Sequence, residues 1–250
     1  MDSRVLAVSA PYIRLRNRSG SLPTATTAMG EIVTAIGSVV AKLSNENYAH
    51  SFAFYRFWFG IGQKHYQIPI DQISDAIWNN RTTGSMIDPG HGKLFHSTAH
   101  LIVRFARDTE SDRALGPRSP GLQNRLYTKT LREFFNRNLS TAWYIENGWG
   151  TIDTADFCAD GNLIAHWANL GCVEEAAIRH EILQSLISHQ KLYDHQADAL
   201  IILFKLAGAT FEAYADPLVV DHCFELLKDH YSCGSVKWEL VQVRATRNER

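Results

Sequence analysis

Basic side chains gather in the middle of the chain, between residues 104 and 137. The candidate nucleic-acid-binding set consists of Arg104, Arg107, Arg118, Arg125, Lys129, Arg132 and Arg137. Arg125, Lys129 and Arg132 recur at helical spacing, which predicts a basic stripe along one face of a helix. Guanidinium groups form paired hydrogen bonds with phosphates and stack on bases. The set therefore indicates a groove for single-stranded nucleic acid, and a basic face that meets only solvent is the alternative.

Three histidines, His91, His96 and His100, form a second set that could bind a metal ion. His96 and His100 are four residues apart, a spacing that places two imidazoles on one face of a helix. The string from Ile87 to Gly92 also resembles the zinc-histidine turn of the amidases that cleave peptide stems from cell-wall sugars. The Ser-x-His-Ala strand end of that family does not follow it, so the resemblance covers the turn alone. A metal or catalytic site and a packed or solvent-facing pair are both kept as interpretations.

Signatures of the common enzyme classes are absent from the sequence. It contains no Gly-x-Ser-x-Gly string, no P-loop and no Gly-x-Gly-x-x-Gly string. We therefore expect no cofactor and favour a protein without enzymatic activity. An enzyme with a histidine-lined site is kept as an alternative.

Charge is divided unequally along the chain. Residues 1–139 hold 17 Lys and Arg against 10 Asp and Glu, whereas residues 140–235 hold 4 against 14. The net charge of −1 conceals this polarity. A basic and an acidic half suit either a polyanionic partner or head-to-tail self-association. Two solvated surfaces of unlike sign are the remaining interpretation.

Helical periodicity runs through most of the chain. Apolar residues at three- and four-residue steps predict a helix from Thr26 to about Ser44, and further helices start at Asp71 and Leu94. Consecutive helices are predicted near 122–135, 140–146, 155–170, 173–189, 193–207 and 216–231. Short strands are expected at 5–8 and 236–240. The predicted fold is mainly α, a helical bundle or array with a small β-containing N-terminal portion and a short C-terminal strand.

The segment 52–59 is the most aromatic part of the chain, with six rings in eight positions. Its length and period do not decide between a strand and a buried helix. Six exposed rings would leave a soluble monomer with a large apolar patch. We therefore expect this run to be largely buried, either in the core or in a subunit contact.

These patterns together favour one continuous globular domain, with a mixed, basic portion at 1–121 and a helical, acidic portion at 122–250. We expect a cytoplasmic protein without a membrane partner, because neither a secretory leader nor an apolar stretch of spanning length is seen. The leading hypothesis is a non-enzymatic, self-assembling, nucleocapsid-like protein whose basic half binds RNA. A helical protein–protein interaction module and the histidine-lined enzyme are the alternatives.

Overall fold

The computed structural model describes residues 25–81, 99–113, 115, 121–148, 154–173, 175–188 and 191–231. Within these ranges the chain forms nine α-helices and one π-helical turn, and no strand. The elements are α1 (Ala25–Val40), α2 (Tyr48–Ile61), η1 (Gly62–Tyr66), α3 (Ile70–Asn79), α4 (Ala99–Ser111), α5 (Leu122–Glu146), α6 (Thr154–Asn169), α7 (Ala176–Leu186), α8 (Asp194–Tyr214) and α9 (Pro217–His230). The predicted mainly helical fold is confirmed. The two expected strands, at 5–8 and 236–240, lie outside the described residues.

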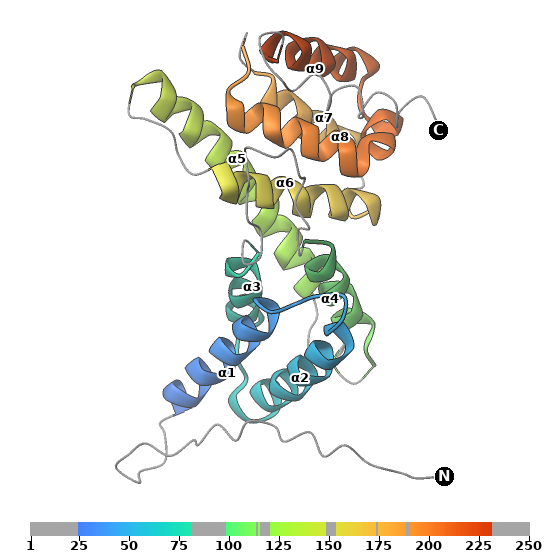
Figure 1. The fold of residues 1–250 in the computed structure, drawn as a ribbon. Coiled ribbons are helices and arrows are strands. Elements are labelled where there is room, and N and C mark those ends of the chain that lie inside the picture. The colour runs from blue at the N-terminus through green and yellow to red at the C-terminus, as the bar shows by residue number, and fades with distance from the viewer. Residues whose placement is uncertain are drawn as a thin grey trace.

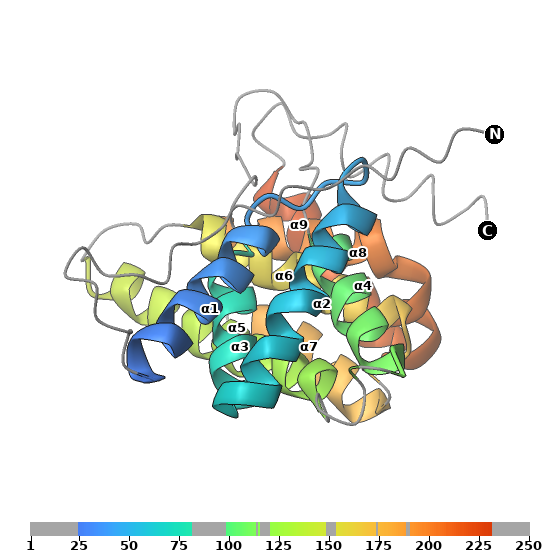
Figure 2. The ribbon, with the colours of Figure 1, turned by 90° about the horizontal axis from the view of Figure 1, so that it is seen from below.

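The helices form two groups that α5 and α6 join (Figure 1). Helices α1 to α4 lie at one end and α7 to α9 at the other (Figure 1), so that α1 to α4 are in front in the view from below (Figure 2). The 25-residue α5 packs against α3, α4, α6 and α7. The two ends of the molecule therefore present different surfaces. No helix in the described ranges combines the length and the apolar character needed to cross a membrane.

One hydrophobic core runs through both groups, and α6 and α8 form its densest part. Trp167 of α6 and Leu200 of α8 are completely buried there. Phe134 of α5 stacks on Phe157 of α6, with ring centres 4.5 Å apart. Stacked rings add to the stability gained from burying apolar area. This core fixes the positions of α5 and α6 relative to both groups.

The aromatic run forms helix α2, which settles the choice that its sequence left open. Tyr55 and Phe59 are fully buried, and the Tyr55 ring lies 4.4 Å from that of Phe105 on α4. The expected burial is confirmed for this inner face of α2. Phe57 is the exception, because 54% of it is exposed on the outer face.

Two predicted helix boundaries are wrong. The predicted helices 122–135 and 140–146 are one helix, α5, because neither glycine nor proline separates them and buried positions such as Asn138 continue across the join. Gly208 does not end α8, which continues to Tyr214 with a local irregularity at Ala207 (φ −136°, ψ 22°). The completely buried Phe211 anchors these last turns to the core.

Candidate functional site

A shallow, open cleft of about 700 Å³ lies along the outer face of α2 and the following π-helical turn. The residues that line this α2 cleft are Ala49, Phe52, Ala53, Arg56, Phe57, Gly60, Ile61, Lys64 and His65. They follow one another at three- and four-residue steps, so they form a continuous stripe along the helix. Most of the stripe faces away from the core, and its Phe52 and Ile61 side chains are partly buried against the core.

The floor of the α2 cleft is apolar and part of its rim is basic. Alanine and glycine positions leave room beside the half-exposed ring of Phe57. Lys64 and His65 are exposed at the C-terminal end of the stripe. The Arg56 guanidinium is held by Asp112, with 3.1 Å between Nε and Oδ2. None of the described lining residues is acidic, so the cleft suits an apolar side chain with polar or acidic neighbours.

The C-terminal end of α5 presents a second apolar surface. Leu139 is 68% exposed and Trp143 is 51% exposed, and their spacing of four residues places them on one helical face. The Tyr144 ring packs edge to face with Trp143, at 5.3 Å between centres. This end of α5 extends past the neighbouring helices in Figure 1. We call Leu139, Trp143 and Tyr144 the α5 tip.

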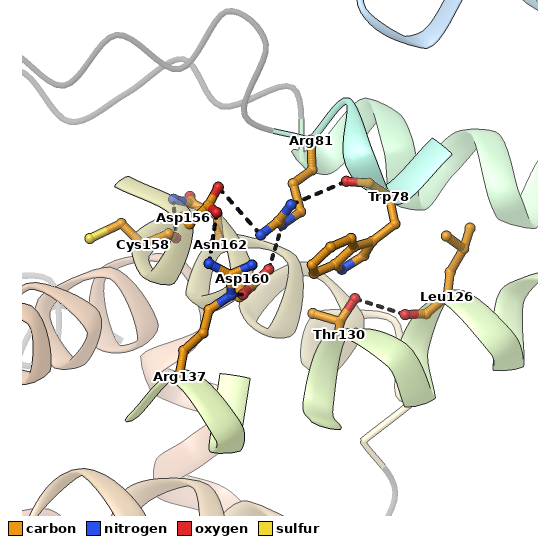
Figure 3. A network of polar contacts seen from close by, with 9 residues as sticks. All are labelled: Trp78, Arg81, Leu126, Thr130, Arg137, Asp156, Cys158, Asp160 and Asn162. Carbon is orange, nitrogen blue, oxygen red and sulfur yellow. Dashed lines mark hydrogen bonds and ion pairs between the residues drawn. The ribbon is translucent and has the colours of Figure 1, made fainter. Parts of the chain in front are cut away.

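A buried polar network joins α3, α5 and α6 (Figure 3). Arg81, just past the end of α3, is 3% exposed and its Nε donates to Asp160 Oδ1 at 2.5 Å. Its guanidinium also stacks on Trp78, 3.5 Å from the ring centre. From α5, Arg137 Nη1 donates to Asp156 Oδ2 at 2.7 Å, and its Nε lies 3.3 Å from Asp160 Oδ2. Two cations thus share two carboxylates at the junction of the two helix groups.

The electrostatics of this network reflect its burial. Burial raises the pKa of the Asp160 carboxyl to about 6, although Arg81 and Arg137 favour the ionised form. A charge taken out of water destabilises the fold unless partners compensate for it. The Asp160 side chain is fully inaccessible and Arg81 is nearly so, which leaves little room for a substrate. The network therefore has the geometry of a buried structural contact between α3, α5 and α6.

Acidic side chains of neighbouring helices contact three of the seven residues in the predicted nucleic-acid-binding set. Arg125 and Lys129 of α5 contact Asp71 and Asp75 of α3, respectively. Arg137 belongs to the buried network. The stripe predicted along α5 is thus engaged with the N-terminal helix group over part of its length.

The rest of that set is more open to solvent. Arg104 and Arg107 are each 52% exposed and both approach Asp108 on α4. Arg132 is 65% exposed and lies 3.3 Å from the carboxylate of Glu133. Arg118 lies outside the described residues. Arg104 and Arg107 stand on α4, whereas Arg132 stands on α5.

The histidine set is described only in part, because His91 and His96 lie outside the described residues. His100 stands in the first turn of α4, and its ring centre lies 5.8 Å from that of His166 in the last turn of α6. His100 Nε2 lies 3.3 Å from Asn45 Oδ1. Burial and the neighbouring His100 lower the pKa of His166 to about 4. Among the described residues, no three His, Cys, Asp or Glu side chains gather in a metal-binding group.

Sequence reasoning missed the α2 cleft, the buried network and the partner of His100. One usable signal was the pair Asp156 and Asp160, four residues apart in a helix that is otherwise mostly apolar. Two carboxylates on such a face call for buried cations. The pairing of His100 with His166 left no local signal, because 66 positions separate them in the chain.

Comparison of the chain with protein-family models, with curated proteins and with solved structures gave no match. Functional inference for this chain therefore rests on the geometry of its surfaces.

Proposed function

We propose that this is a non-enzymatic, self-assembling protein, in which the α5 tip of one copy docks into the α2 cleft of the next. One observation carries the proposal: a single chain presents an apolar cleft on the α1 to α4 group and an exposed apolar end on the joining helix α5. Helix-in-groove recognition uses such pairs of anchors one helical turn apart.

The two surfaces match in size and chemistry. Leu139 and Trp143 are about 6 Å apart along the helix axis, and the α2 cleft is itself a stripe several turns long. Burying the exposed half of the Trp143 ring, roughly 100 Å², contributes about 2 to 3 kcal/mol. Tryptophan is also the residue type most enriched among the dominant contacts of interfaces.

Charge supports the same pairing. Between Arg137 and the end of α5 the chain has no further basic residue, and Glu146 is exposed in its last turn. The cleft offers Lys64 and His65 and no acidic residue among those described. Complementary charge of this kind favours the correct orientation and speeds association.

Association through two different surfaces is head to tail. A contact of this type repeats from copy to copy and either closes into a ring or grows as a chain. The α2 cleft belongs to one helix group, whereas the α5 tip projects beside the other (Figure 1). The acidic excess of residues 140–235 also favours head-to-tail contact, because two acidic ends repel each other.

Light scattering coupled to gel filtration, over a range of protein concentrations, tests this proposal. The wild type should grow in mass with concentration, whereas Phe57→Asp and Trp143→Asp should each remain monomeric. Leu218→Asp is the matched control, because Leu218 on α9 is 77% exposed and belongs to neither surface. A wild type that is monomeric at every concentration would contradict self-assembly, and unchanged assembly of both variants would contradict these surfaces.

Binding of single-stranded nucleic acid is the second candidate function. Arg104, Arg107 and Arg132 favour it, because their side chains are more than half exposed. Ion pairs between such exposed groups are weak, so a phosphate can replace the neighbouring carboxylate. Together with assembly, this activity would make the protein nucleocapsid-like. A mobility-shift titration with single-stranded RNA at low and moderate salt tests it.

A further inference from the structure

We infer that His100 and His166 form a binding site for a divalent first-row transition-metal ion, with Zn²⁺ as the probe. Their imidazole rings come from different helices, yet the ring centres are 5.8 Å apart and the ring planes are inclined at 51°. Helices α4 and α6 pack directly against each other. The fold therefore holds the two rings together before any ion arrives.

The separation of the rings suits a shared ion. Two imidazoles that bind one tetrahedral ion, at about 2.1 Å from nitrogen to metal, have ring centres about 5 to 6 Å apart. His166 is partly buried at the end of α6, whereas His100 is exposed. An ion can therefore reach the site from solvent.

Asn45 supplies the orienting contact that such sites use. Its Oδ1 atom accepts a hydrogen bond, so the 3.3 Å contact with His100 Nε2 requires the proton to be on that nitrogen. The lone pair of His100 is then on Nδ1, the second nitrogen of the ring. Metal-binding histidines commonly donate their other N–H to an oxygen in this way, which fixes the ring for binding.

The donor set also indicates which ions fit. Neutral imidazole nitrogen is a good ligand for zinc, copper and nickel, and a poor one for calcium or magnesium. Two imidazoles leave the remaining coordination positions to water or to a further ligand. The site would hold an exchangeable ion on the surface between α4 and α6, apart from the α2 cleft and the α5 tip.

Calorimetric titration of Zn²⁺ into the full-length, tag-free protein tests the inference. We expect one ion per chain at this site, and at least about tenfold weaker binding in His100→Ala and in His166→Gln. His222→Ala is the control, because His222 is an exposed histidine on α9 that should not affect the site. Circular dichroism shows whether His166→Gln still folds, and His100→Ala alters only an exposed side chain.

Two results would overturn the inference: wild-type protein that does not bind Zn²⁺, or His100→Ala protein that binds it as tightly as the wild type. The monomeric Trp143→Asp variant should retain wild-type Zn²⁺ affinity. That measurement separates this site from the self-assembly surfaces, so either proposal can fail alone.

Discussion

Replacing Arg81 with methionine should strongly destabilise the fold. The substitution keeps a long apolar stem against Trp78 and removes the guanidinium that serves the fully buried Asp160. Removing one partner of a buried ion pair typically costs about 3 to 5 kcal/mol, because the other charge stays buried with poorer compensation. A domain is held together by only about 5 to 15 kcal/mol, so much of the free energy of unfolding would be lost.

The structure shows where this loss arises. Asp160 loses the 2.5 Å hydrogen bond from Arg81 Nε and keeps Arg137, whose Nε lies 3.3 Å from the other carboxylate oxygen. Trp78 loses a cation stacked at 3.5 Å, a contact worth about 1 to 2 kcal/mol when it is out of water. Because Arg137 still compensates the charge of Asp160, the expected loss of unfolding free energy lies at the lower end of the range of about 3 to 5 kcal/mol.

The effect should depend on pH. The native pKa of Asp160, about 6, lies above the ordinary value of 3.8, so the native state binds more protons between these values. The contribution of Asp160 to stability is therefore fully present below 3.8 and is lost as the pH rises through 6. Removing Arg81 raises this native pKa further. The loss of unfolding free energy caused by Arg81→Met should be greatest at about pH 8. It should shrink as the pH falls and Asp160 takes up its proton.

Urea unfolding followed by circular dichroism, at about pH 8 and about pH 5, measures the destabilisation and its dependence on pH. Lys129→Met is the matched control, because Lys129 lies 4.6 Å from the centre of the same Trp78 ring but pairs with the exposed Asp75. That variant should lose less than about 1 kcal/mol at either pH. The reasoning is refuted if Arg81→Met is no more destabilising than this control, or if its penalty does not change with pH.

Two further predictions concern the core and the nucleic acid. Ile182→Asp should lower the free energy of unfolding by several kcal/mol, because Ile182 on α7 is completely buried, and an unchanged thermal melt would show that this face of α7 is not in the core. Charge reversal of Arg104, Arg107 and Arg132 to glutamate should abolish binding of single-stranded RNA. Each phosphate that the wild type contacts should release about 0.7 counterions, so its affinity for RNA should fall as the salt concentration rises. A wild type that fails to shift RNA at low salt would exclude the nucleic-acid function.

Helices could be predicted from the sequence wherever an apolar stripe recurs at helical spacing. Ile182 and Leu186 are four residues apart in the helix that the sequence predicts at 173–189, and both are completely buried. The periodicity did not locate every helix end, as the continuation of α8 past Gly208 shows. Packing of Phe211 against the core outweighs the small cost of a glycine within a helix.

The polar contacts could not be predicted, because they join residues far apart in the chain. Arg81 and Asp160 are 79 positions apart, and Arg125 meets Asp71 across 54 positions. The spacing of Arg125 and Lys129 predicted a basic face, but whether a phosphate or a carboxylate meets that face depends on the helix packed beside it. The α2 cleft was hidden for a related reason, since a run of aromatic residues does not show which of its rings the core leaves uncovered.

Mixing two assembly-defective variants tests the proposed self-assembly most directly. Phe57→Asp removes the α2 cleft and keeps the α5 tip, whereas Trp143→Asp keeps the cleft and removes the tip. Each variant alone should be monomeric, and an equimolar mixture should form a one-to-one dimer that grows no further, because each chain then has one working surface. Light scattering of the mixture measures this mass. A mixture that stays monomeric would show that the α5 tip and the α2 cleft do not bind each other.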